Sequence, residues 1–183
     1  SPHPSMPIGF WNDKDNARYK SAYFEKFENV WHQGDFVELT VNKGLKFFGR
    51  SDAVLNPGGV RIGTAEIYRI VETMEEVIEG VVIGQNIGDD QRVVLFLKVV
   101  ENVLFDETLV KKIKQQIRSR ATPRHVPAII LKVEDIPRTK SGKIAEIAVR
   151  DTVHGYDIKN MASLANPEAV KYFKNIKELN FVT

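Results

Sequence analysis

The sequence predicts a small α+β domain with a three-stranded sheet, preceded by a β-hairpin. Two valine-rich runs, "EGVVIG" (79–84) and "RVVLFLKVV" (92–100), have the composition of interior strands and are separated by a single turn. Apolar residues recur at helical spacing on both sides of this pair. With 183 residues, 43% of them hydrophobic, the chain is long and apolar enough to bury a core of this kind.

The hairpin is predicted from "FVELTVNKGLKFFGR" (36–50), in which two short β-like runs flank Asn42-Lys43-Gly44. A glycine-rich turn, "LNPGGVRIG" (55–63), comes next. The third strand of the sheet is expected in "AIILKV" (128–133). Residues 1–20 are rich in proline, polar groups and aromatics and show no clean period.

Three helices are expected. The first begins with Thr64 as its N-cap, because serine and threonine side chains accept hydrogen bonds from the first free amides of a helix. The second is capped by Asp106 and runs through Arg120. The third is the amphipathic stretch "KIAEIAVRDTV" (143–153), which Gly155 ends. The inward-facing residues of the second helix are Leu109, Val110, Ile113 and Ile117.

These elements divide the chain into three expected parts. The order β-β, α, β, β, α, β, α describes a hairpin and then a small α+β domain. We place the end of the first part at residue 50, the small domain at 51–155, and an extension at 156–183 that contains a short helix in "NPEAVKYF".

Composition excludes several classes of function. The formal net charge of +2 is too small by itself to imply a nucleic-acid or membrane partner. The absence of cysteine excludes disulfides, thiolate catalysis and cysteine-ligated metals, and suits a reducing compartment. No run of 18 apolar residues and no signal-peptide pattern occurs, so a cytoplasmic protein is expected. Because Ser1 is not an initiator methionine, we expect a processed chain or part of a longer one.

The loop "IPRTKSGK" (136–143) concentrates positive charge behind a proline. It is not a phosphate-binding P-loop, because Pro137 stands where that motif needs glycine and Ile144 where it needs serine or threonine. Two interpretations remain open. The loop is either a solvated hairpin tip, or an arm whose Lys143 delivers a compact charge to a phosphate or carboxylate.

A second candidate site lies in "WHQGDF" (31–36) and the segment that begins at Arg50. Asp35 and Arg50 flank the predicted hairpin, and together a carboxylate and a guanidinium can grip the two hydroxyls of a ribose. The alternative is that Asp35 simply belongs to a turn and that Arg50 forms a local salt bridge with Asp52.

The third candidate is the basic run "KKIKQQIRSRATPR" (111–124), which contains no acidic residue. It suits a polyphosphate or nucleic acid, but it equally suits the solvated side of a helix. It lacks the interleaved aromatics of a single-strand binder. The four histidines show no metal-ligand spacing, so we predict no metal site in the chain.

In this order, "WHQGD", "GRSDAVLNPGGVRIGTAEIY" and "IPRTKSGK" resemble the closing third of the adenylate-forming enzymes, a superfamily that includes acyl-CoA synthetases, peptide-synthetase adenylation domains and luciferases. Within it, "GFWND", "RHVP" and "NPEAVKYF" are similar to the ligases that activate acetoacetate. The resemblance implies that residues 51–155 are the small C-terminal swinging domain. Such enzymes convert a carboxylate and ATP to an acyl-adenylate and pyrophosphate. The small domain then swings, and coenzyme A displaces AMP to give a thioester.

The resemblance also implies roles for individual residues. Lys143 would contact the substrate carboxylate and the α-phosphate during adenylation. Asp35 would bind the ribose hydroxyls of ATP with Arg50 beside it, and Arg61 would approach the phosphates. Asp52 would be the hinge. For coenzyme A, Gly59 would line the pantetheine tunnel and Arg118 would contact the 3′-phosphate.

Further expectations concern cofactors and partners. The family uses ATP with Mg²⁺, and coenzyme A as co-substrate. Its phosphate loop, acyl pocket and adenine-binding segment lie in a large N-terminal domain that nothing here matches, so that domain is the expected partner, and the chain alone is expected to be inactive. No nucleic-acid or membrane partner is expected. The alternatives are a synthetase for another short acyl group such as acetate, a non-catalytic regulatory or interaction domain derived from the family, and a nucleic-acid binder that uses the basic helix.

Overall fold

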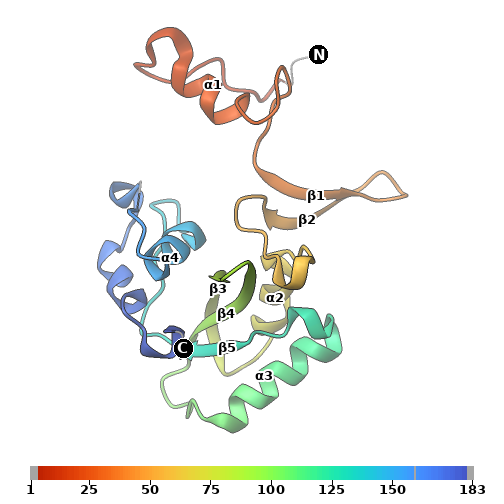
Figure 1. Ribbon diagram of the computed structural model, residues 1–183, viewed down its shortest axis with the longest axis vertical. Helices are drawn as coiled ribbons and strands as arrows, with labels where there is room; N and C mark the ends of the chain where they lie inside the picture. Colours follow the sequence, from red (N-terminus) through yellow and green to blue (C-terminus); the bar gives the residue numbers. More distant parts are fainter. Residues whose placement is uncertain (1–3, 159, 181–183) are drawn as a thin grey trace. The chain divides into compact units, whose positions relative to one another are not determined.

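The computed structural model describes residues 4–158 and 160–180. It contains two compact units, Ser1–Gly34 and Asp35–Thr183, each of which is described by itself (Figure 1). The boundary between the two units lies between Gly34 and Asp35, before the hairpin, whereas the sequence predicts a domain division after the hairpin, at residue 50. The division at residue 50 therefore stays a prediction.

Over the described residues 4–34, the first unit contains one short α-helix, α1 (Ala17–Tyr23), preceded by a 3₁₀ turn, η1 (Lys14–Asn16). The carboxylate of Asp13 accepts hydrogen bonds from the amides of Arg18 at 2.9 Å and Tyr19 at 2.8 Å, and so satisfies donors that a helix start leaves free. An aromatic cluster holds the unit together. It consists of Phe10, Tyr19, Tyr23, Phe24 and Trp31, with neighbouring ring centroids 5.4–5.8 Å apart.

The second unit contains a two-stranded hairpin and a three-stranded sheet. The strands are β1 (Asp35–Leu39), β2 (Leu45–Arg50), β3 (Val77–Ile87), β4 (Asp90–Val99) and β5 (Ile129–Lys132). The α-helices are α2 (Thr64–Val71), α3 (Glu107–Arg120) and α4 (Glu146–Val153). The 3₁₀ segments are η2 (Pro57–Gly59), η3 (Pro123–His125), η4 (Met161–Ser163), η5 (Pro167–Phe173) and η6 (Lys177–Leu179).

The sheet has the order β3-β4-β5, with an antiparallel pair β3-β4 and a parallel pair β4-β5. Its strands alternate between two buried faces, as the pleat of a strand requires. Leu95 and Leu97 of β4 point into a core that α2 and α3 cover, whereas Val94 and Phe96 point into a second core with Val149 of α4. The predicted α+β fold, with a three-stranded sheet, helices and a hairpin, is therefore confirmed.

The C-terminal segment completes the second core. Phe173 of η5 is 1% exposed and meets Phe96 of β4 edge to face, with ring centroids 4.9 Å apart. Leu179 is also buried, and its carbonyl accepts hydrogen bonds from Gln85 and Arg92, both at 3.0 Å. The short helix predicted in "NPEAVKYF" is present as the 3₁₀ segment η5.

The start of α2 differs from the prediction, whereas the start of α3 agrees with it. Helix α2 is capped by Gly63 and not by Thr64, and the Gly63 amide donates to the Glu66 carboxylate at 3.3 Å. A Cβ at Gly63 would lie 2.3 Å from the carbonyl oxygen of Phe48 in β2, so only glycine allows the helix to approach the hairpin this closely. The predicted cap of α3 is confirmed, because Asp106 accepts from the Leu109 amide at 2.9 Å.

Helix α4 begins at Glu146, three residues later than the predicted start at Lys143. Residues 138 and 144 pair in an isolated antiparallel bridge, and this pairing keeps Lys143 out of the helix. Within residues 4–158 and 160–180, no helix is long and apolar enough to cross a membrane.

Candidate functional site

A pocket of about 600 Å³ brings three predicted site residues together in the second unit. Asp35 and Arg50 reach it from the two strands of the hairpin, and Lys143 reaches it from the loop before α4. Tyr68 of α2 and Glu146 of α4 also line it. The pocket therefore combines anionic, cationic and aromatic groups from segments that are distant in the sequence.

Arg50 connects two of the predicted acidic residues. Asp35 and Arg50 are direct partners in the β1-β2 register, and the Arg50 guanidinium lies 3.7 Å from the Asp35 carboxylate. The same guanidinium donates to both carboxylate oxygens of Asp52, at 3.2 and 3.4 Å. Arg150 of α4 holds the main-chain carbonyl of Asp52 at 2.7 Å. The predicted hinge residue is thus fixed on its side chain by the hairpin and on its backbone by α4.

The turn that carries Lys143 is closed by its own backbone and one threonine. The Thr139 amide donates to the Lys143 carbonyl at 2.8 Å, and the Gly142 amide donates to the Thr139 carbonyl at 2.8 Å. The Thr139 hydroxyl accepts from the Lys143 amide at 3.2 Å. Gly142 has φ +82°, a left-handed conformation that glycine adopts without steric cost.

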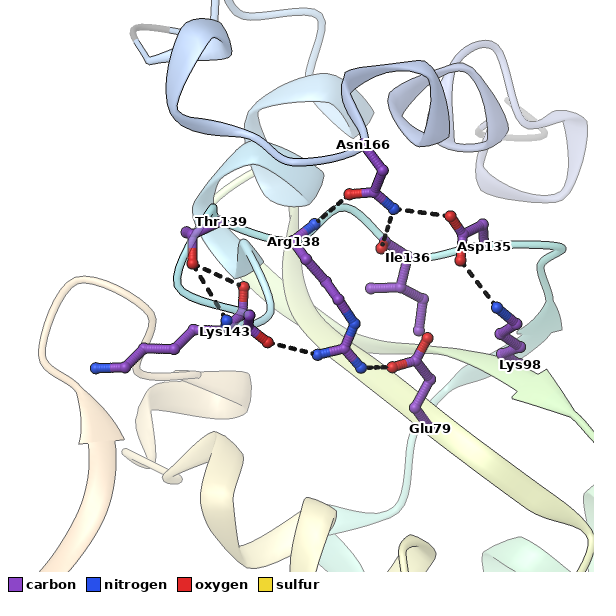
Figure 2. A network of polar contacts seen from close by, with 9 residues as sticks. Glu79, Lys98, Asp135, Ile136, Arg138, Thr139, Lys143 and Asn166 are labelled. Atoms are coloured by element: carbon purple, nitrogen blue, oxygen red, sulfur yellow. Dashed lines mark hydrogen bonds and ion pairs between the residues drawn. The ribbon is translucent and has the colours of Figure 1, made fainter.

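The side chain of Lys143 is exposed and extends away from the polar network at the base of its loop (Figure 2). No ion pair between described residues uses it. Arg138 holds the loop from beneath, because its guanidinium donates to the Gly142 carbonyl at 2.7 Å and pairs with the buried Glu79 of β3. These contacts fix the backbone of the loop, and the ammonium group of Lys143 stays exposed at the pocket.

Two titratable groups that the sequence did not single out meet in the same pocket. Burial, followed by the charge of Glu146, raises the pKa of Tyr68 well above its usual value. Burial also raises the pKa of the Glu146 carboxyl, and hydrogen bonds from Tyr68 and Thr64 oppose this rise. The Tyr68 hydroxyl in turn accepts from the Val82 amide at 3.0 Å. Periodicity identifies neither residue, since their pairing depends on how α2 packs against the start of α4.

The remaining predicted residues lie outside this pocket. Gly59 lines a separate hollow of about 340 Å³ beside the β3-β4 turn, and a Cβ placed on it would meet nothing within 4 Å. The preceding Gly58 amide is tied to Asp90 at 2.8 Å. Arg61 and Arg118 are both exposed, the latter on α3. The predicted site residues therefore separate into a group around Lys143 and a group outside its pocket.

The basic face of α3 is largely engaged with its neighbours. Lys112 pairs with Glu76, Lys114 donates to the Ala128 carbonyl at 3.2 Å, and Arg120 donates to the Thr73 hydroxyl at 2.7 Å. Lys111 pairs with Glu107 one turn away at 3.5 Å. These contacts are those of a solvated helix side that supports the fold.

Comparison with known proteins narrows the class. No family model matches the chain. In fold, the chain matches acetoacetyl-CoA synthetase from Streptomyces lividans with a TM-score of 0.86 and 36% identity, over 94% of this chain and 26% of that one. The fold is that of the C-terminal domain of an adenylate-forming enzyme.

Sequence comparison then gives the curated relatives of the chain. The chain is 60% identical over 176 residues to acetoacetyl-coenzyme A synthetase of Rhizobium meliloti (strain 1021), and 43% identical over 180 residues to acetoacetyl-CoA synthetase of Xenopus tropicalis. These matches cover 96% and 97% of this chain but 27% of each relative. The chain is thus homologous to acetoacetyl-CoA synthetases along nearly its whole length, and it spans about a quarter of theirs.

Proposed function

We propose that the chain is the C-terminal part of an ATP-dependent acetoacetate–CoA ligase and that it supplies the lysine for the adenylation step. One observation carries the proposal. Asp35, Arg50 and Lys143, which the family resemblance assigns to ribose binding and adenylation, line a single pocket. Acetoacetate is proposed as the acyl substrate because the relatives with 60% and 43% identity are named for it.

In the first half-reaction, an oxygen of the acetoacetate carboxylate attacks the α-phosphorus of ATP. The bond between that phosphorus and the bridging oxygen breaks, and pyrophosphate leaves. Lys143 neutralises the negative charge that collects between the carboxylate and the α-phosphate as they approach. Asp35 accepts hydrogen bonds from the ribose hydroxyls, and Arg50 holds the Asp35 carboxylate in place. Arg61 approaches the phosphates.

The nucleotide brings Mg²⁺ as its partner ion, which offsets phosphate charge. Among the described residues, no group of three histidine, aspartate or glutamate side chains is arranged to hold a metal. The contribution of these residues to the phosphates is therefore cationic, through Lys143 and Arg61. Magnesium is assigned to the nucleotide itself.

In the second half-reaction, the thiol sulfur of coenzyme A attacks the acyl carbon of the adenylate, the bond from that carbon to the AMP oxygen breaks, and the thiol proton is released. Gly59 then lines the path of the pantetheine arm, and Arg118 contacts the 3′-phosphate. Asp52 is the hinge between the two arrangements. The open space beside Gly59 supports this assignment, because a side chain there would project into the path.

The proposal is tested in the full-length protein with Lys143→Ala. Acetoacetate-dependent ATP–pyrophosphate exchange should fall by about 100-fold or more, whereas thioester formation from preformed acetoacetyl-adenylate should continue. Lys140→Ala is the matched control, because Lys140 is an exposed lysine of the same loop. Unchanged exchange in Lys143→Ala would show that the loop is only a solvated tip.

A second test concerns the partner. The residues around Lys143 supply neither an acyl pocket nor a phosphate loop, and we propose that both belong to a large N-terminal domain of the same protein. The 183-residue chain alone should then catalyse neither half-reaction. Acetoacetate-dependent adenylation by the purified chain would refute this part of the proposal.

A further inference from the structure

The side-chain amide of Asn166 joins the C-terminal extension to the base of the Lys143 loop (Figure 2). Its oxygen accepts from the Arg138 amide at 2.7 Å. Its nitrogen donates to the Asp135 carboxylate at 2.7 Å and to the Ile136 carbonyl at 3.0 Å. An amide is the group that offers an acceptor and two donors together, so neither aspartate nor leucine reproduces these three bonds.

The backbone on either side of Asn166 pairs with the same loop. The Ala165 amide donates to the Arg138 carbonyl at 2.8 Å, and the Lys140 amide donates to the Ser163 carbonyl at 2.9 Å. Residues 139 and 164 form an isolated antiparallel bridge, and residues 138 and 144 form another. Three short segments therefore lie edge to edge, with the outgoing limb of the loop between the extension and the returning limb that carries Lys143.

The network also reaches the core of the sheet. Asp135, which Asn166 contacts, forms an ion pair with Lys98 of β4, whose ammonium nitrogen lies 2.9 Å from the carboxylate. Arg138 donates its main-chain amide to Asn166, and its guanidinium forms an ion pair with the buried Glu79 of β3. The loop is thus fixed to β3 and β4 from one side and to the extension from the other. Asn166 contributes to both connections.

We propose that Asn166 is a positioning residue for adenylation, which holds the loop so that Lys143 projects into the pocket shared with Asp35 and Arg50. The inference rests on the proposed function of Lys143. Asn166 does not itself line that pocket, although its neighbours Ser163 and Leu164 do, so it acts through the loop and not on a substrate. Displacing a catalytic group by about 1 Å is enough to lower a rate roughly 100-fold.

The first test measures the loop directly and needs no activity. In the 183-residue chain, trypsin can cleave after Arg138, Lys140 and Lys143. Asn166→Asp places a second carboxylate against Asp135 and removes both donors. It should therefore accelerate cleavage in the loop about tenfold relative to cleavage within α3, because two partly buried hydrogen bonds are lost.

The rescue variant combines Asn166→Asp with Asp135→Asn. The exchanged pair restores one amide-to-carboxylate hydrogen bond, and the Arg138 amide keeps an acceptor. Loop cleavage should return to within about threefold of the original chain. Glu168→Ala, an exposed change two residues along the extension, is the control and should leave cleavage unchanged. Equal loop cleavage in Asn166→Asp and the original chain would overturn the positioning role.

The second test uses the full-length protein. Asn166→Asp should lower the kcat of ATP–pyrophosphate exchange about tenfold or more, leave the KM for ATP within about threefold, and spare thioester formation from preformed adenylate. The exchanged pair should recover most of the exchange rate. A loss shared equally by both half-reactions would indicate general damage to the fold and would refute positioning.

The two proposals fail in different ways. If Lys143→Ala abolishes exchange and Asn166→Asp does not change it, the lysine keeps its role and the positioning inference is wrong. If Lys143→Ala has no effect on exchange, the proposed function is wrong, and the catalytic part of the inference falls with it. The cleavage assay still decides whether Asn166 fixes the loop.

Discussion

The chain contains two turns of the same construction, at 40–44 and at 139–143. In each, the threonine amide donates to the carbonyl of the fifth residue, at 2.9 Å for Thr40 and 2.8 Å for Thr139. In each, the threonine hydroxyl accepts from the amide of the fifth residue, at 3.0 and 3.2 Å. The fourth residue is left-handed in both, Lys43 with φ +60° and Gly142 with φ +82°.

Their surroundings differ. The first turn joins two strands that expose large apolar side chains, among them Leu39 at 70% and Leu45 at 59%. The second is held by Arg138, by Asn166 and by the paired extension. Local turn chemistry therefore determines the shape of both loops, whereas contacts from distant segments determine which of them holds a lysine in a fixed place.

Arg138→Ala should remove the strongest anchor of the second turn. It leaves the buried Glu79 carboxylate without its cationic partner, which should cost roughly 2 kcal/mol of unfolding free energy. Glu38→Ala, an exposed change just before the first turn, should cost less than about 0.5 kcal/mol. Denaturant unfolding of both variants measures the difference. Equal losses of unfolding free energy in Arg138→Ala and Glu38→Ala would mean that the Arg138–Glu79 pair adds nothing to stability.

Gly142→Val tests the left-handed position. A β-branched residue at φ +82° is strained, so the variant should lose about 1–2 kcal/mol in the same unfolding measurement. The equivalent site of the first turn already carries Lys43, and Lys43→Gly should change stability by less than about 1 kcal/mol. A Gly142→Val chain as stable as the original would show that the loop adjusts its backbone freely.

Replacing each turn threonine by valine compares the turns most directly. Thr40→Val should speed hydrogen exchange of the Lys43 amide about fivefold, because the turn loses hydroxyl bonds that nothing else replaces. Thr139→Val should speed exchange of the Gly142 amide less than about twofold, because distant anchors keep the loop closed. Equal acceleration at the two amides would contradict the role of the anchors.

The smallest effect concerns pH. Burial opposes ionisation of Asp135, but hydrogen bonds from Lys98 and Asn166 outweigh it and hold the pKa of Asp135 below its usual value. A lowered folded-state pKa gives stability that is present above the unfolded pKa and is lost as the pH falls through the folded pKa. At pH 7, the melting temperature of Asp135→Asn should be slightly below that of the original chain. The corresponding loss of unfolding free energy should be well under about 1 kcal/mol, because the carboxylate is partly exposed. The difference in melting temperature should disappear on acidification below about pH 4. A gap that widens in acid would be the wrong sign.

Much of this arrangement follows from short stretches of sequence. The nearly unbroken apolar run "RVVLFLKVV" predicts a strand buried on both faces, and Asn42-Lys43-Gly44 predicts the hairpin, because each depends on neighbours along the chain. The family resemblance predicted roles for Lys143, Asp35 and Arg50, and the fold places these three residues around one pocket.

What the sequence did not reveal depends on contacts between distant segments. Asn166 lies 28 residues from Arg138, and its own neighbourhood in the sequence shows only that it precedes a proline. The helical spacing of apolar residues from Ile144 onward predicted a start at Lys143, but the pairing of residues 138 and 144 overrides that propensity. The shared environment of Tyr68 and Glu146 likewise exists only once α2 and α4 are packed.

The position of the extension in the chain also bears on biosynthesis. A ribosome makes Lys143 and its turn before it makes residues 163–166, which pair with that turn, and before Phe173, which fills the second core. A nascent chain that has reached the end of α4 contains the lysine but not the segment that holds it. Translation must therefore pass Phe173 before the loop is in place, and products truncated between α4 and Phe173 would carry a lysine that the extension does not hold.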